Sequence, residues 1–87
     1  MASIRKVLTT VLSGRSDMNI RFADLRRILS ALAFVEHIKG DHHIFTRQGA
    51  VEIVNLQPLP GGKAKPYQVK QVRQMITKYG LSIGKQP

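Results

Sequence analysis

The sequence predicts a small α+β protein with the element order α-α-β-β-β-α, in which helices cover one face of a three-stranded antiparallel sheet. Apolar residues recur at helical spacing near both ends of the chain. Between them lie three short β-prone runs separated by glycine-bearing turns. The 87 residues suffice for one domain, near the lower size limit for folding without disulfides or metals.

Two helices are expected first. One covers residues 3–13 and ends at Gly14, and the next covers about residues 21–33, where Asp24 near its start suits the helix dipole. Each presents an apolar stripe that can pack on a core. The stripes comprise Ile4, Val7, Leu8, Val11 and Leu12 in the first, and Phe22, Leu25, Ile28, Leu29 and Leu32 in the second.

Three strands follow, at residues 34–39, 42–47 and 50–56. Gly40-Asp41 and Gln48-Gly49 separate them, and two-residue connections that contain glycine are typical of tight hairpins. These runs therefore predict an antiparallel meander.

A loop at residues 57–66 holds most of the prolines and leads to a final helix at 66–79. Proline is acceptable in the first turn of that helix, and Gly80 is a plausible C-terminal cap on which Leu81 can fold back. The buried stripe of this helix is expected to contain Val69, Val72, Ile76 and Tyr79, with Met75 at its margin.

The charge is strongly positive. Fourteen Lys and Arg face five acids, which gives a net charge of +9, and every acid lies between Asp17 and Glu52. Such a chain attracts polyanions, of which nucleic acid is the commonest in a cell. The alternatives are a basic protein with no such role and one half of a pair whose partner is acidic.

The composition also restricts the kind of site and the compartment. With no cysteine there is no disulfide, thiolate zinc site or cysteine nucleophile, which fits a reducing cytoplasm. No apolar run is long enough to span a membrane. The basic N-terminus lacks a small-x-small cleavage site, so an ordinary amphipathic helix is favoured there over a targeting peptide.

The motif KGDHHIF (39–45) raises the question of a histidine site. Side chains alternate between the two faces of a strand, so His42 and His43 point to opposite faces and do not easily chelate one metal. With a two-residue turn, one face carries Val35, His37, Lys39, His42, Ile44 and Thr46. The other carries Phe34, Glu36, Ile38, His43, Phe45 and Arg47, and its apolar residues predict that it meets the helices. A one-residue slip of register would reverse the faces.

His42 is the candidate catalytic residue on the outward face. An imidazole near neutral pH can take a proton from a ribose 2′-OH or give one to the leaving 5′-oxygen, without a metal or other cofactor. The plainer reading is a surface histidine with no special role. His37 is expected to be a solvated strand residue, and His43 a partly buried one that can support His42. A metal site built from His37 and His42 lacks an obvious third ligand.

Three lysines are candidate RNA contacts. Lys39 lies opposite His42 in the expected hairpin, where it can offset charge on the phosphorane. The loop PGGKAKP can present Lys63, Lys65 and backbone amides to a phosphate, but it lacks the Walker pattern of a nucleotide hydrolase. The alternative for this loop is a connector with no binding role.

Residues 20–82 resemble the HicA toxin family of bacterial type II toxin–antitoxin systems. The resemblance is carried by IRFADLRRILSALAFVEHIKGDHHIFTRQGAVEIVNLQP and GKAKPYQVKQVRQMITKYGL, which contain a Gly-x-His-His-Ile-Phe hairpin, a basic loop with proline and a closing helix ending in Gly-Leu. It implies a fold like that of double-stranded-RNA-binding domains and ribosome-independent cleavage of mRNA in the bacterial cytoplasm. It also implies that a HicB-like antitoxin neutralises the protein, and that operator DNA is bound mainly through that partner.

The resemblance assigns catalysis to the histidine two positions after the hairpin glycine, which is His42, and an aromatic core position to Phe45. The chain departs from the family in Asp41, where a small residue is usual. An acid there can favour the cationic imidazole or repel phosphate. Residues 1–15 extend beyond the family domain as a helix that can pack on the core, shield an apolar patch or contact the antitoxin. Residues 83–87 are expected to be a flexible tail.

Two further functions remain open from the sequence. One is a non-catalytic RNA-binding module with the same fold, and the other is an interaction protein that binds an acidic partner but no RNA.

Overall fold

A computed structural model describes residues 3–83 and confirms the predicted α-α-β-β-β-α order, with one short 3₁₀ turn added between the first two helices. Most of the predicted tail at residues 83–87 lies outside the described residues. The elements are α1 (Ile4–Ser13), η1 (Asp17–Asn19), α2 (Phe22–Ala31), β1 (Val35–Lys39), β2 (His42–Thr46), β3 (Val54–Leu56) and α3 (Pro66–Tyr79).

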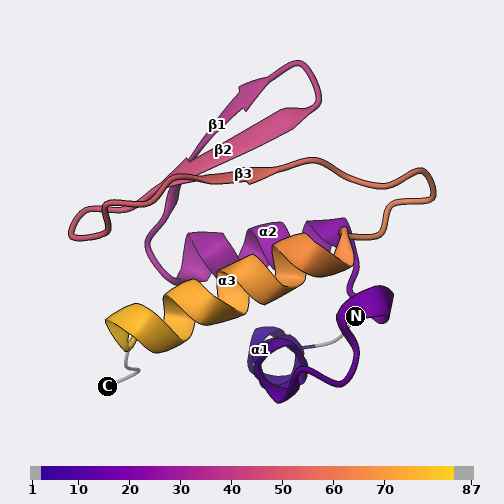
Figure 1. Ribbon diagram of the computed structural model, residues 1–87, viewed down its shortest axis with the longest axis horizontal. Coiled ribbons are helices and arrows are strands. Elements are labelled where there is room, and N and C mark those ends of the chain that lie inside the picture. Colours follow the sequence, from indigo (N-terminus) through magenta and orange to yellow (C-terminus); the bar gives the residue numbers. More distant parts are fainter. Residues whose placement is uncertain (1–2, 84–87) are drawn as a thin grey trace.

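The elements form layers (Figure 1). The sheet lies on one side of α2 and α3, and α1 lies on the side of these helices that is remote from the sheet. One apolar cluster joins the layers, because Val7 and Val11 of α1 belong to the same buried core as Phe45 of β2 and Val54 of β3. Of the roles left open for the N-terminal helix, packing on the core is therefore the one that the structure shows.

The helix ends follow local signals in the sequence. The Ser3 side chain accepts a hydrogen bond from the N–H of Lys6 (3.2 Å) and caps α1, and Gly14 ends that helix with a φ of 70°. Gly80 ends α3 in the same left-handed conformation, and the N–H of Leu81 donates to the carbonyl of Ile76 (3.0 Å). These are the contacts of a glycine-based C-cap.

Helix α2 ends two residues earlier than predicted. Ala33 adopts a φ of 70°, and the N–H of Phe34 then donates to the carbonyl of Leu29 (3.0 Å). This reversal sends the Phe34 side chain, which is 6% exposed, into the core. The chain leaves α2 directly into β1.

The sheet has the strand order β1-β2-β3, so β1 is an edge strand. Lys39 pairs with His42 and His37 with Ile44, which confirms the predicted two-residue turn and the predicted faces of the hairpin. Phe45 is fully buried on the face that meets the helices. Ile38 lies on that face too but is 58% exposed, because the tip of the hairpin extends beyond the helices (Figure 1).

The prediction of a strand over residues 50–56 is wrong in extent, because β3 covers only Val54–Leu56. Gln48-Gly49 is consequently not a two-residue hairpin turn. The Arg47 guanidinium donates to the carbonyl of Leu32 (2.8 Å), and the N–H of Ala50 donates to the carbonyl of Arg47 (3.1 Å). After Arg47 the chain therefore leaves the sheet, and it returns to pair with β2 only at Val54.

Contacts with the end of α3 hold residues 50–53 away from the sheet. Glu52 accepts hydrogen bonds from the Tyr79 hydroxyl and from Nζ of Lys78 (2.6 Å). Lys78, and then Tyr79, lower the pKa of Glu52 to about 2. These long-range contacts are absent from the local pattern that predicted a longer strand.

Gln68 on α3 closes the outer edge of β3. Its amide oxygen accepts from the N–H of Gln57 (3.2 Å), and its amide nitrogen donates to the carbonyl of Asn55 (3.2 Å). A neighbouring strand would make the same pair of bonds two residues apart. Gln68 is 4% exposed although it lies outside the predicted apolar stripe, and its two backbone partners satisfy the buried amide.

Arg73 links α3 to the N-terminal part of the chain. Its guanidinium donates to both carboxylate oxygens of Asp17 (2.8 and 3.0 Å) and to the carbonyl of Val11 (3.0 Å). Hydrogen bonding from Arg73 lowers the pKa of Asp17 below its usual range. The pair thus stabilises the packing of α1 and η1 on α3.

We expect Arg73→Met to lower the free energy of unfolding by about 2 kcal/mol at neutral pH, because Asp17 and the Val11 carbonyl lose a charged donor. Since the pKa of Asp17 is lower in the folded state, this stabilisation is present above the usual aspartate pKa of about 3.9 and is lost as the pH falls through the folded-state value. Urea unfolding at several pH values measures it.

The matched control for this variant is Arg5→Met, which removes the same charge from an exposed position of α1. The difference in stability between the wild-type protein and Arg73→Met should shrink as the pH falls through the folded-state pKa of Asp17, whereas the control should follow the wild type throughout. Equal stability of all three proteins at neutral pH would contradict the role assigned to Arg73.

Candidate functional site

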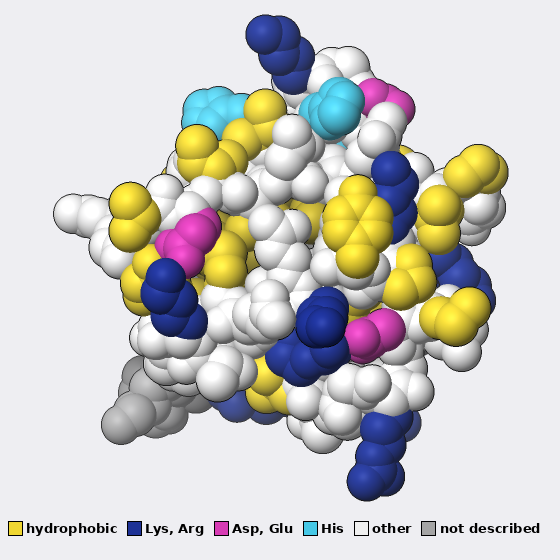
Figure 2. Space-filling model, in the orientation of Figure 1, with side chains coloured by type: hydrophobic (Ala, Val, Ile, Leu, Met, Phe, Trp, Pro, Cys, Tyr) yellow, Lys and Arg dark blue, Asp and Glu magenta, His cyan; other side chains and the backbone are white. Residues whose placement is uncertain are grey.

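The face of the sheet that points away from α2 and α3 carries a mixed set of polar and apolar side chains. These are Val35, His37, Lys39, His42, Ile44, Thr46 and Asn55. Figure 2 shows histidine side chains at the end of the molecule where the β1–β2 hairpin projects, close to both basic and acidic groups. This face, called the open face below, contains the predicted catalytic residue.

Asn55 on β3 holds one side of the His42 ring. Its Oδ1 lies 3.1 Å from Nδ1 of His42, and an amide oxygen can only accept, so Nδ1 carries the hydrogen. In the neutral ring the lone pair is then on Nε2. The His42 side chain is 49% exposed, so part of the ring is open to solvent. A contact that fixes the tautomer is what a general base requires of its supporting residue.

Asp41 lies on the Nε2 side of the ring, with Oδ1 3.8 Å from that nitrogen. Its other oxygen accepts a hydrogen bond from Nε2 of Gln57 (2.6 Å), and Oε1 of the same Gln57 side chain accepts one from Nζ of Lys65 (3.2 Å). The bond from Gln57, with smaller contributions from the charges of His42 and Lys65, lowers the pKa of Asp41. The carboxylate is therefore ionised at neutral pH beside the candidate base.

The three predicted lysines are placed differently. Lys39 pairs with His42 across the hairpin, and Lys65 joins the same cluster through Gln57. Lys63 instead donates to the side chain of Asn19 (2.9 Å), in a segment that forms a bridge with Arg21. The structure thus brings Lys39 and Lys65 toward His42 and directs the Lys63 ammonium group toward η1.

His43 faces the helices. Its Nδ1 lies 2.7 Å from Oε2 of Glu36, and its ring meets the Phe22 ring edge to face at a centroid distance of 4.9 Å. Arg26 forms a bidentate pair with the same Glu36 (2.7 and 3.0 Å), and this pair, followed by His43, lowers the pKa of Glu36. His43 thus contributes to the contact between α2 and the sheet rather than to the His42 site.

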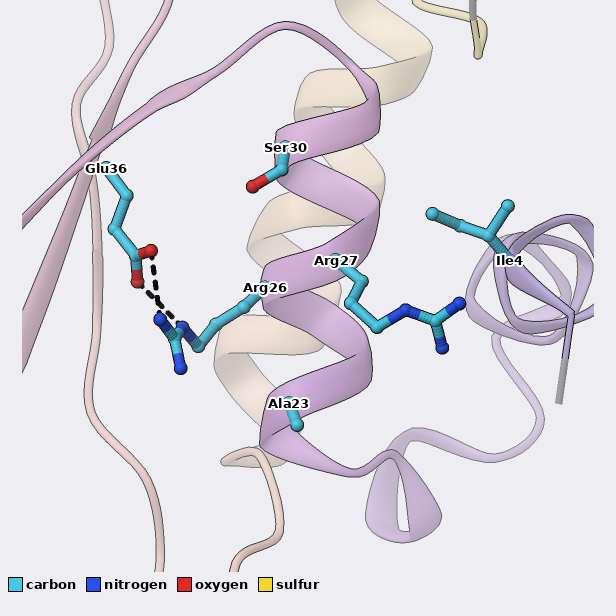
Figure 3. A pocket seen from close by; sticks show the side chains of 6 residues that line it. All are labelled: Ile4, Ala23, Arg26, Arg27, Ser30 and Glu36. Carbon is cyan, nitrogen blue, oxygen red and sulfur yellow. Dashed lines mark hydrogen bonds and ion pairs between the residues drawn. The ribbon is translucent and has the colours of Figure 1, made fainter. Parts of the chain in front are cut away.

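A groove of about 480 Å³ lies on the helix side of the hairpin (Figure 3). In it Arg26 reaches toward Glu36, whereas Arg27 points toward Ile4 of α1. Both guanidinium groups are paired, because Arg27 also contacts Asp24 at 3.2 Å. This groove is on the opposite side of the sheet from His42 and has no evident place in its chemistry.

Sequence reasoning missed Asn55 and Gln57, the two residues that contact His42 and Asp41. The sequence Val54-Asn55-Leu56-Gln57 contained one signal for them. Its apolar and polar residues alternate, so Asn55 and Gln57 point to the same face of a strand, opposite to the apolar residues. The predicted meander already paired the third strand with the second, but it did not give the observed register, in which Asn55 lies opposite Ile44. Among residues 3–83 no group of three or more His, Cys, Asp or Glu side chains is arranged to hold a metal ion.

Comparison with protein-family models, with curated proteins and with solved structures finds no match for this chain. Within residues 3–83, no helix is long and apolar enough to cross a membrane.

The histidine contacts predict a specific pattern of tautomers. In long-range ¹⁵N–¹H NMR spectra of the neutral rings, His42 and His43 should carry their hydrogen on Nδ1, because each Nδ1 faces an oxygen acceptor. In Asn55→Leu, the His42 ring should show a mixture of the Nδ1-H and Nε2-H tautomers, because the acceptor for its Nδ1 is gone. The signals of His43 should not change. A His42 ring that carries its hydrogen on Nε2 in the unaltered protein would refute the arrangement.

Proposed function

We propose that this protein is a HicA-type toxin, a metal-independent endoribonuclease that cleaves mRNA and is neutralised by a HicB-like antitoxin. The single observation that carries the proposal is the state of His42, whose Nδ1 contacts Asn55 while about half of its side chain is exposed on a strongly basic protein. The family resemblance of residues 20–82 selects the same residue. The protein would act in the bacterial cytoplasm and bind operator DNA mainly through its partner.

The reaction assigned to His42 is an internal transfer. The ribose 2′-oxygen attacks the adjacent phosphorus and loses its proton, the bond to the 5′-oxygen breaks, and that oxygen gains a proton. The products are a 2′,3′-cyclic phosphate and a 5′-hydroxyl. Nε2 of His42 supplies one of the two proton transfers, as base toward the 2′-OH or as acid toward the 5′-oxygen.

The neighbouring charges bear on the transition state. Lys39 lies across the hairpin from His42. Lys65 is linked to Asp41 through the side chain of Gln57. Both cations can therefore offset negative charge on the phosphorane. The Asp41 carboxylate repels the substrate phosphate, and the Lys65 cation reduces that repulsion. Lys63, directed toward η1, is assigned a contact with RNA farther from the cleaved bond.

A non-catalytic RNA-binding module is the second candidate, and the position of Asp41 favours it. A carboxylate 3.8 Å from Nε2 occupies the side of the ring that a phosphate would approach. An RNA-binding module would need the basic surface but no free imidazole nitrogen.

Substitution of His42 tests the proposal. His42→Ala should slow cleavage of a fluorescent single-stranded RNA by about 10²- to 10⁴-fold, because general acid–base groups contribute that much. Excess EDTA should leave the wild-type rate unchanged. The measurement is the appearance of shortened RNA, with the cyclic phosphate identified by mass spectrometry, together with growth arrest on expression.

His37→Ala is the matched control, since His37 is an exposed histidine on the same face of the hairpin. It should retain the wild-type rate within about threefold. Equal RNA decay with wild type and His42→Ala would refute catalysis by His42. RNA that is bound by the wild type but never shortened would establish the non-catalytic module.

A further inference from the structure

Among the Phe and Tyr rings of residues 3–83, one is exposed. The Tyr67 side chain is 66% exposed, whereas Phe22, Phe34 and Phe45 are buried in the core and Tyr79 is half-buried with its hydroxyl bound to Glu52. Core packing does not account for the position of Tyr67. A large ring left in water in this way is a candidate contact for a ligand.

Tyr67 is linked to the His42 cluster through Gln68 and Asn55. It occupies the first turn of α3, directly after Pro66. Its hydroxyl is 3.5 Å from the amide nitrogen of Gln68, and that nitrogen donates to the carbonyl of Asn55, the residue that holds His42. The tyrosine hydroxyl therefore lies near the outer edge of β3, at the upper limit of hydrogen-bond distance from Gln68, while most of the residue is exposed.

A second chain of contacts leads to the same place. Lys65, two residues before Tyr67, reaches Gln57 and through it Asp41. The start of α3 therefore brings a cation and an aromatic ring together at the border of the open face. A basic groove that follows the backbone, with aromatic rings for the bases, is the general composition of single-strand binding sites.

We infer that Tyr67 is a base-stacking site for single-stranded RNA and that it takes an unpaired nucleobase next to the phosphate held at His42. This inference rests on the RNA-binding part of the proposed function and is independent of catalysis. Cleavage by the 2′-oxygen requires that the attacking and leaving oxygens lie in line, which a regularly stacked strand does not allow. A ring that captures one base outside the stack would favour that geometry.

The test measures binding without cleavage, in the full chain carrying His42→Ala. In this background, Tyr67→Ala should weaken binding of a short single-stranded RNA by about 5- to 100-fold, and Tyr67→Phe should stay within about twofold, because base stacking needs the ring and not the hydroxyl. Fluorescence anisotropy at several salt concentrations gives both the affinity and its salt dependence. Tyr67→Ala should leave the salt dependence unchanged.

Lys65→Gln is the contrasting variant. It should reduce the slope of log Kd against log salt by about 0.7, the value for one phosphate contact on a single strand. Tyrosine fluorescence gives a second readout, because the chain has two tyrosines and no tryptophan. Single-stranded RNA should quench this emission in the Tyr79→Phe control and not in Tyr67→Phe.

The outcomes separate the two proposals. If the His42→Ala protein binds no RNA, the proposed function fails together with this inference. If it binds RNA but Tyr67→Ala has unchanged affinity, or loses affinity only through a smaller salt slope, the stacking site is refuted while RNA binding stands. Equal sensitivity of duplex RNA to Tyr67→Ala would likewise refute a site for an unpaired base.

Discussion

The two hydrogen bonds of the Gln68 amide couple the sheet to α3. They hold the backbone on both sides of Leu56, which is fully buried, and so fix the outer edge of a strand only three residues long. The same two backbone positions carry the side chains of Asn55 and Gln57, which contact His42 and Asp41 on the open face. A buried amide on one side of the sheet thus determines the positions of the polar groups on the other. A hydrocarbon side chain at this position would leave the N–H of Gln57 and the C=O of Asn55 without these partners.

Much of the fold could be predicted because its signals are local. The limits of α3 follow from Pro66, an apolar period and Gly80, and the hairpin register follows from the turn at Gly40-Asp41. Strand β3 could not be predicted in the same way, because Glu52 is drawn toward α3 by residues far along the chain. The longer connection shifts the pairing by two residues relative to a tight turn at Gln48-Gly49, so side chains keep their faces.

The candidate site was predictable only in part. Strand alternation was enough to separate His42 from His43 and to place Lys39 beside His42. The partners of the two rings were not predictable, since Asn55 of β3 and Phe22 of α2 come from other elements and meet His42 and His43 only in three dimensions. The direction of the Lys63 side chain was not predictable from the basic composition of its loop. It depends on the nearest hydrogen-bond acceptor, which is Asn19, a residue distant in the sequence.

The edge strand β1 has a consequence for self-association. Its outer backbone groups are unpaired within the sheet, and Val35 and Ile38 are 57% and 58% exposed, so two copies could in principle join their sheets edge to edge. The net charge of +9 opposes this, because like-charged molecules repel over a distance of about 8 Å at physiological ionic strength. A bound polyanion neutralises that charge. The positive charge that we propose attracts RNA would then also keep the free protein dispersed, and a partner that covers β1 would protect the neutralised complex from aggregation.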